Sequence, residues 1–276
     1  MSIKHIREVN TQTVTPAGII AKPDMLVVEE PMEIRISHGV GAARRQLRVA
    51  VTMRTPGDDE DLAAGFLFTE GIIPDFSAVM AVKWLEENTL LIELHPGIRV
   101  EEERLTRHLF ISSSCGLCGK ASLDAVQTVS CYFPAPGKPV FSDTQIYHLP
   151  TILRIAQTTF ESTGGLHAAG LFDAQGHLTI LREDVGRHNA VDKVIGAALR
   201  NAYPLPFREN ALLVSGRAGF ELVQKAVMAG IPLLAAVGAP SSLALELAES
   251  TGMTLIGFLR GKRFNIYTGA DRIRPI

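Results

Sequence analysis

The fold is decided by residues 211–237, ALLVSGRAGFELVQKAVMAGIPLLAAV, in which two short apolar runs flank a segment with helical spacing. Ala211–Val214 and Pro232–Val237 are predicted strands, and Gly219–Ala229 is the helix expected between them. A strand, a helix and a second strand in this order predict a parallel pair. Because both strands are apolar throughout, helices should cover both faces of the sheet. The pattern continues with a helix and a strand at Ser242–Ser250 and Thr254–Leu259.

The residues before this stretch fit the same layered architecture. Leu149–Phe160 and Arg187–Asn201 have helical spacing. Ala168–Phe172 and Leu178–Leu181 are short apolar runs on either side of a turn at 173–176. We therefore expect residues 141–276 to form one α/β domain, with residues 111–140 as a mobile segment and a proline-rich linker.

The first part of the chain predicts a smaller α+β domain, residues 1–110. Asp58–Gly71 has acidic residues at its start, an apolar stripe and a final glycine, which indicate a helix. Four short strands surround it, two with alternating polarity and two forming a hairpin. These strands are Met32–Ser37, Leu47–Met53, Val79–Leu85 and Leu90–Leu94.

The composition of the chain excludes several classes of function. The chain has 276 residues, of which 46% are hydrophobic, so it can bury a substantial core. Its formal net charge of −2 gives no bulk attraction to nucleic acid or to an anionic membrane. Residues 1–8 lack the apolar core of a secretion signal, and no apolar run is long enough to span a bilayer. We expect a cytoplasmic protein whose three cysteines stay reduced.

Residues 115–119, CGLCG, are the strongest chemical signal in the sequence. Residues 120–126 have helical spacing, so Cys115 and Cys118 would lie at a helix N-terminus, where a thiolate is favoured. Four interpretations stay open at this point. The pair could be buried and structural, could bind zinc together with Cys131 and histidines, could form a thioredoxin-like disulfide, or could carry sulfur as a persulfide.

The second signal is residues 182–193, REDVGRHNAVDK, which precede and begin a helix. Gly186 would place Arg187 and His188 at the helix N-terminus, where an anion is welcomed. The plain alternative is a charged face in contact with solvent.

Three turns after strands complete the candidate site. Ser215 and Arg217 follow the strand 211–214 in a turn of small residues, and residues 237–242 repeat that shape. The last apolar strand ends in residues 258–263, which contain three cations around a glycine. Because carboxyl ends of parallel strands share one edge, the turns should converge on a crevice suited to a phosphate-rich ligand. His167 could line this crevice or pack as an ordinary histidine.

Taken together, these motifs resemble the FdhD family, the sulfurtransferases that serve formate dehydrogenase. The resemblance covers nearly the whole chain and includes residues 64–71 and 257–268. It implies that a persulfide, received from a cysteine desulfurase, is passed to the molybdenum or tungsten bis-guanine-dinucleotide cofactor. It also implies a cytidine-deaminase-like, three-layer second domain without the zinc site, no intrinsic metal, and a homodimer.

The resemblance also assigns roles to individual residues. Cys115 matches the persulfide cysteine, and Cys118 is the paired cysteine with a supporting role. The cofactor-binding stretch matches residues that also form the basic turn described above: Phe258, Leu259, Arg260, Gly261, Lys262 and Arg263. We therefore expect a sulfurtransferase. The rival hypothesis is a non-catalytic cofactor-binding chaperone with a structural or zinc-binding cysteine pair.

Overall fold

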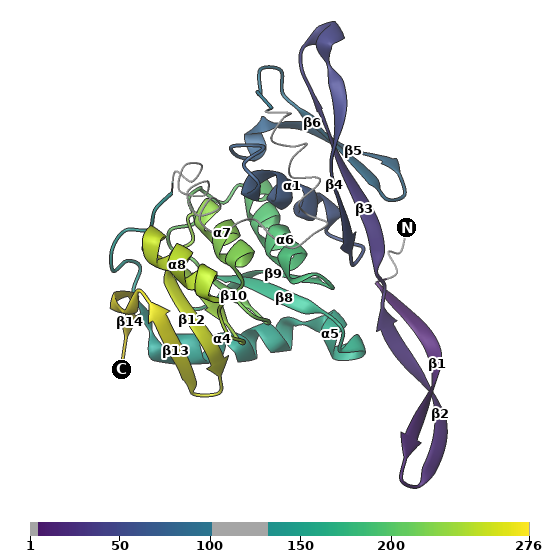
Figure 1. Cartoon of the computed structure of the whole chain (residues 1–276), viewed down its shortest axis with the longest axis vertical. Helices are drawn as coiled ribbons and strands as arrows, with labels where there is room; N and C mark the ends of the chain where they lie inside the picture. Colours follow the sequence, from purple (N-terminus) through teal and green to yellow (C-terminus); the bar gives the residue numbers. More distant parts are fainter. Residues whose placement is uncertain (1–4, 101–131, 276) are drawn as a thin grey trace.

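The computed structural model describes residues 5–100 and 132–275 (Figure 1). Within these residues, two sheets enclose a layer of helices, and a long hairpin projects from one side of the molecule (Figure 1). The mixed α/β class expected from the sequence is confirmed. The predicted domain boundaries at 110 and 140 stay predictions, and the cysteine pair lies outside the described residues.

The larger sheet is built from the second half of the chain. Its six strands, in spatial order, are β13 (Arg263–Thr268), β12 (Thr254–Arg260), β11 (Leu233–Ala236), β10 (Ala211–Val214), β8 (His167–Phe172) and β9 (Leu178–Asp184). The three central strands β10, β11 and β12 are parallel, as predicted. The strands at the two ends run antiparallel to their neighbours, because hairpins return the chain along both sides.

Helices cover both faces of this sheet (Figure 1). On one side lie α6 (Arg187–Arg200), α7 (Phe220–Met228) and α8 (Ser242–Thr251); on the other lie α4 (Asp143–Ala156) and the short α5 (Thr158–Thr163). Residues alternate along the central strands: Leu212 packs in the core beneath α6 and α7, whereas Leu213 packs in the core beneath α4. This alternation explains why the strands are apolar throughout.

The predicted helix Leu149–Phe160 is divided differently. Ser142 caps α4 by accepting the amide of Gln145 at 3.1 Å, while the Gln145 side chain accepts the amide of Ser142 at 2.7 Å. This capping box starts the helix six residues before the predicted position, 143 against 149. Gln157 leaves the helical region with ψ of 86°, which separates α4 from α5.

The first part of the chain forms a four-stranded sheet and one helix, as predicted. The strands, in spatial order, are β4 (Arg45–Arg54), β3 (Glu30–His38), β6 (Thr89–Leu94) and β5 (Val79–Glu86), and the helix is α1 (Asp59–Thr69). Small additional elements are β7 (Phe141–Ser142), which pairs with β14 (Ile273–Arg274), and 3-10 turns at Gly41–Ala43, Phe76–Ala78 and Ala270–Arg272.

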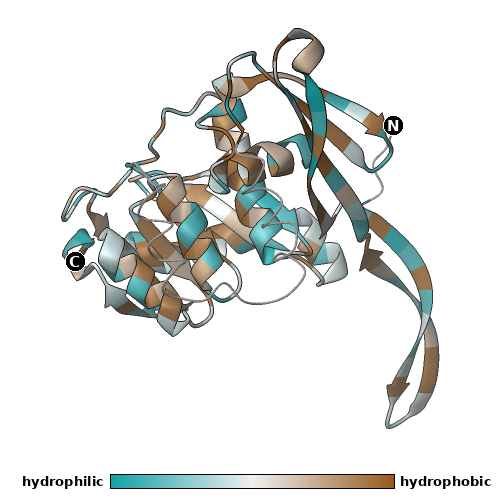
Figure 2. Ribbon diagram, turned by 45° about the horizontal axis from the view of Figure 1, so that its top comes forward, coloured by the Kyte–Doolittle hydropathy of each residue, from teal (hydrophilic) through white to brown (hydrophobic). Residues whose placement is uncertain are grey.

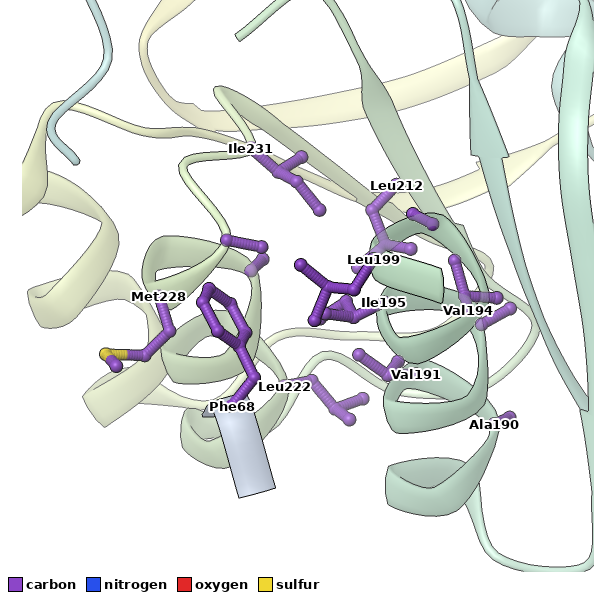
Figure 3. Packing of buried hydrophobic residues seen from close by; sticks show 14 of the residues in the cluster. Phe68, Ala190, Val191, Val194, Ile195, Leu199, Leu212, Leu222, Met228 and Ile231 are labelled. Carbon is purple, nitrogen blue, oxygen red and sulfur yellow. The ribbon is translucent and has the colours of Figure 1, made fainter. Parts of the chain in front are cut away.

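Helices α1 and α6 lie between the two sheets and join them into one core (Figure 1). Phe68 of α1 packs with Val191, Ile195 and Leu199 of α6 in a single buried cluster (Figure 3). The helices approach closely at two glycines. A Cβ on Gly65 would lie 1.8 Å from the carbonyl oxygen of Asp192, so only glycine fits there. The α1–α6 contact therefore fixes the N-terminal sheet relative to the larger one.

A hairpin of β1 (Ile6–Thr15) and β2 (Gly18–Val27) was not predicted from the sequence. It extends away from the rest of the chain, and apolar and polar residues are interspersed along it (Figures 1 and 2). Val14, Ile19 and Ile20 are 77%, 66% and 57% exposed. In the described part of the chain, no helix is both long and apolar enough to cross a membrane.

Candidate functional site

The charged segment 182–193 is mostly buried against the N-terminal part of the chain. The carboxylate of Asp184 lies 2.7 Å from Nζ of Lys193, and both side chains are buried. The same carboxylate accepts the amide of Gly186 at 2.8 Å and the side-chain amide of Asn189 at 3.0 Å. Lys193 also donates to the carbonyl oxygen of Thr55 at 2.9 Å. Asp184 and Lys193 therefore fix the start of α6 against the chain that follows β4.

Two other members of the segment hold neighbouring elements in place. Arg182 donates to the carboxylate of Asp61 on α1, with Nη2 and Oδ2 2.7 Å apart, and Arg200 binds the same carboxylate. Glu183 accepts the backbone amide of Phe160 at 2.9 Å at the start of α5. These contacts give Arg182 and Glu183 structural roles rather than a place in the crevice.

Asp192 is part of a buried polar cluster between α1, α6 and α7. Its carboxylate accepts the hydroxyl of Thr69 at 2.8 Å and lies 3.0 Å from Nζ of Lys225. Lys225 also reaches the carboxylate of Glu70 at 3.2 Å. Burial alone would lower the pKa of Lys225, but the two carboxylates raise it above its ordinary value, so this ammonium stays charged.

Arg187 and His188 are the members of the segment that face the sheet edge. Gly186 is the N-cap of α6 and supplies no side-chain cap. Nε of Arg187 is buried without a hydrogen-bond partner among the described residues. Nε2 of His188 lies 2.6 Å from the carboxylate of Glu221 on α7, and this hydrogen bond lowers the pKa of Glu221. The start of α6 thus carries an arginine with an unused donor beside a histidine that is bound to Glu221.

The three turns after β10, β11 and β12 lie side by side. The Gly238 amide donates to the carbonyl oxygen of Gly216 at 2.8 Å, and the Phe258 amide donates to the carbonyl oxygen of Gly238 at 3.0 Å. A Cβ on Gly238 would lie 2.9 Å from Cγ of Arg217, so glycine is needed for this approach. Ser215 secures the first turn to β8 by accepting the amide of Ala168 at 2.9 Å. The three turns are therefore neighbours at one edge of the sheet, while the ligand-binding crevice expected there stays a prediction.

The third turn differs from the other two. Residues 260–263 link β12 to the antiparallel strand β13, so they form the turn of a hairpin, whereas helices follow the turns after β10 and β11. The pairing is irregular between Gly257 and Arg260, and Phe258 has a φ of 53°. This left-handed conformation is rare for a bulky residue. It accompanies a β-bulge that leaves the Phe258 side chain 40% exposed.

Cations surround these turns. Arg217, Arg260, Lys262 and Arg263 are all exposed, and none forms an ion pair with a described residue. Arg260 donates through Nε to the carbonyl oxygen of Val237 at 3.2 Å, which ties the hairpin turn to the turn after β11. Leu259 is buried in the core beneath α4, so its contribution to the crevice is structural. Unpaired cations beside glycine-rich backbone form a suitable cradle for phosphate oxygens.

The predicted persulfide cysteine Cys115 and its partner Cys118 lie outside the described residues. Among the residues that are described, no three His, Cys, Asp or Glu side chains are placed to hold a metal ion. The described site consequently consists of the three turns, the start of α6, and His167 beside them.

The fold and these turns define the class of the protein: a layered α/β protein with exposed cations at the carboxyl ends of its parallel strands. The chain belongs to the FdhD/NarQ family, whose model matches residues 27–274. It is 53% identical to a protein named sulfur carrier protein FdhD from Mycolicibacterium paratuberculosis, over 94% of this chain and 95% of that one. It is 41% identical to one of the same name from Sulfolobus acidocaldarius, over 97% and 98%.

A crystal structure supports the fold. A candidate formate dehydrogenase accessory protein from Desulfotalea psychrophila superposes with a TM-score of 0.75 at 24% identity, covering 98% of this chain and 99% of that one. At this identity the likeness concerns the architecture alone.

Sequence reasoning missed Glu221 and left His167 undecided. Glu221 follows the Gly219 turn at the start of α7, and no local pattern connects it to His188, which lies on another helix. His167 carries a usable signal, because it begins a strand that forms a hairpin with the strand ending at Asp184. That register places it next to the start of α6.

Proposed function

We propose that this protein is a sulfurtransferase that carries sulfur as a persulfide on Cys115. The donor is a cysteine desulfurase, and the acceptor is the molybdenum or tungsten bis-guanine-dinucleotide cofactor destined for formate dehydrogenase. Family membership and relatives named sulfur carrier protein support the sulfur chemistry. The observation that carries the acceptor side is the convergence of three strand-end turns with unpaired cations around them.

The crevice fits a dinucleotide because its donors match phosphate oxygens. Arg217, Arg260, Lys262 and Arg263 would hold the phosphates of the acceptor from the two outer turns, with Ser215 shaping the first turn. Arg187 and His188 would approach from α6, where Nε of Arg187 has an unused hydrogen. Charge-assisted hydrogen bonds of this kind are stronger than neutral ones. The exposed ring of Phe258 offers an apolar surface at the same place.

The first sulfur transfer, from the donor to Cys115, needs no redox cofactor. The Cys115 thiolate attacks the outer sulfur of the donor's persulfide, a new S–S bond forms on Cys115, and the donor cysteine leaves as a thiolate. In the second transfer the S–S bond breaks and Cys115 leaves as a thiolate, while the outer sulfur bonds to the acceptor. A sulfur atom that ends as a sulfido ligand is reduced by two electrons, which the acceptor metal or a thiol reductant supplies. Cys118 has a supporting role, since direct attack on the persulfide would release sulfide and leave a Cys115–Cys118 disulfide.

The test is mass spectrometry after incubation with a cysteine desulfurase and cysteine. We expect a Cys115-containing peptide to gain the mass of one sulfur atom, and a reductant to remove it. Cys115→Ser should abolish the gain, whereas Cys118→Ser should retain it. An unmodified Cys115 peptide in the wild-type protein would contradict the proposal.

The rival function is a cofactor-binding chaperone without sulfur transfer. It rests on the same exposed cations, which would hold the phosphates of a cofactor whether or not sulfur is transferred. Formate dehydrogenase maturation separates the two functions, because a chaperone would still support it with Cys115→Ser. Stoichiometric zinc in the purified protein would favour the chaperone with a metal-binding cysteine pair.

The remaining expectations concern assembly and location. We propose a cytoplasmic homodimer in which the β1–β2 hairpin contributes to the interface. A two-stranded hairpin is marginally stable alone in water, and this one exposes Val14, Ile19 and Ile20. Sedimentation analysis tests this expectation by comparing the oligomeric state of the wild-type protein with that of the double variant Val14→Ser, Ile19→Ser.

A further inference from the structure

His167 lies at the junction of the elements that form the crevice. It begins β8 and pairs with Asp184, the last residue of β9, just before Gly186 and α6. Its ring also lies against the turn after β10: a Cβ built on Gly216 would be 3.4 Å from Nδ1 of His167. His167 is therefore placed between the start of α6 and the first of the three turns.

The imidazole of His167 has hydrogen-bonding capacity left over within the described part of the chain. The side chain is partly buried, yet its ring makes no hydrogen bond to any residue that the structure describes. Its ring nitrogens are not among the buried polar atoms that lack a partner, so solvent or a ligand can reach them. The ring therefore retains hydrogen-bonding capacity on the crevice side of the strand.

The surroundings of His167 lower its pKa in the free protein. Burial is the largest cause, and the neighbouring Arg187 and His188 act in the same direction. Asp184 acts in the opposite direction but is itself neutralised by Lys193. Glu221 on α7 is paired with His188. An anion bound beside Arg187 would offset the charge of its guanidinium and raise the pKa of His167 again.

We propose that His167 is a ligand-contacting residue of the crevice, which donates a hydrogen bond to a phosphate oxygen bound between the start of α6 and the Gly216 turn. This inference rests on the proposed binding of a guanine-dinucleotide ligand and assigns one further contact within it. Phosphate binding is then coupled to the uptake of a proton by His167. The affinity contributed by His167 is greatest at low pH and declines as the pH rises through the pKa of the ligand-bound imidazole.

The experiment is calorimetric titration of the purified full-length protein with GDP. We compare wild type with His167→Asn and His167→Phe, and with His177→Asn as the control. His177 lies at the opposite end of the β8–β9 hairpin and is exposed. Loss of one hydrogen bond to a charged group should weaken GDP binding about tenfold in both His167 variants. His177→Asn should bind like wild type.

A merely structural histidine would give a different pattern. For the proposed role, the affinity difference between wild type and His167→Asn should grow as the pH falls from about 8 to about 6, a range that spans the ordinary histidine pKa. Comparing the two proteins cancels the titration of GDP itself. Sulfur loading of Cys115 by a desulfurase should be unchanged in both variants, which also shows that they are folded.

Two results would overturn the inference. If folded His167→Asn and His167→Phe bind GDP like wild type at every pH, His167 is not a contact, although the proposed function stands. If wild type itself binds no GDP, the assigned contact and the proposed acceptor site fail together. If the variants bind GDP more weakly by a factor that does not change with pH, binding is not coupled to protonation of His167. The loss of affinity then comes from altered packing.

Discussion

The backbone amide of Phe258 donates a 3.0 Å hydrogen bond to the carbonyl oxygen of Gly238, and it does so from a left-handed conformation with φ of 53°. This bond joins the end of β12 to the turn after β11. The unusual conformation redirects the chain into the hairpin turn that carries Arg260, Lys262 and Arg263. Phe258 thus links a strained backbone to the placement of the cations.

The strain at Phe258 predicts an uncommon stability effect. Left-handed backbone costs a bulky residue roughly 1–2 kcal/mol relative to glycine. Phe258→Gly should therefore raise the free energy of unfolding by about 1 kcal/mol, because the exposed ring contributes little to the core. Phe258→Ala is the matched control and should give no such gain, since alanine has the same conformational penalty. Urea unfolding followed by circular dichroism measures both; equal stability of the two variants would contradict the assignment of strain.

The close contact between α1 and α6 predicts strong intolerance at Gly196. A Cβ there would lie 1.8 Å from the carbonyl oxygen of Asp61, so the helices would have to separate. Gly196→Ala should lower the free energy of unfolding by about 3 kcal/mol, although alanine favours helices intrinsically. Gly219→Ala is the control, because no atom lies within 4 Å of the added methyl group. That substitution should cost less than about 1 kcal/mol.

The buried ion pair of Asp184 and Lys193 predicts a large effect from removing one partner. Lys193→Met would leave the fully buried Asp184 carboxylate without its cation and should destabilise the protein by about 3–5 kcal/mol. Lys83→Met provides a matched comparison, because Lys83 pairs with Glu93 at 2.9 Å but its side chain is 55% exposed. An exposed pair contributes at most about 1 kcal/mol. Thermal or urea unfolding that ranks the two variants equally would remove the structural role given to Lys193.

How far the sequence predicts this molecule depends on whether the signal is local. The strands at 211–214 and 233–236 follow from uninterrupted apolar runs, and α1 follows from its acidic first turn. The hairpin β1–β2 was missed because its strands mix polar and apolar residues and contain Pro23. Local sequence patterns therefore do not indicate that these two strands pair with each other.

The same difference between local and long-range signals applies to the candidate site. The positions of Arg187 and His188 at the start of α6, and of Ser215 and Arg217 in the turn after β10, could be predicted because a glycine or a strand end precedes each pair. Their role in binding stays a prediction. The structural role of Arg182 could not be predicted, because its partner Asp61 lies 121 residues earlier in the chain. Strand β13, which makes residues 260–263 a hairpin turn, was likewise not predicted from the sequence.

The exposed cations of the hairpin turn predict an effect on binding without an effect on stability. Lys262 and Arg263 form no ion pair with a described residue, so replacing them with alanine should leave the free energy of unfolding within about 0.5 kcal/mol of wild type. The double variant should bind GDP at least about tenfold more weakly in low salt, because two positive charges beside the phosphates are lost.

Salt and position separate this specific effect from a general one. The wild-type affinity should fall as salt is raised, and the affinity of the double variant should fall less steeply, since fewer charges remain to be screened. Lys22→Ala is the matched control: Lys22 is an exposed cation on β2, in the projecting hairpin. Lys22→Ala removes one positive charge, as each substitution of the double variant does, but it should leave GDP binding unchanged. If Lys22→Ala weakens binding as much as Lys262→Ala does, the attraction comes from overall charge rather than from the turn after β12.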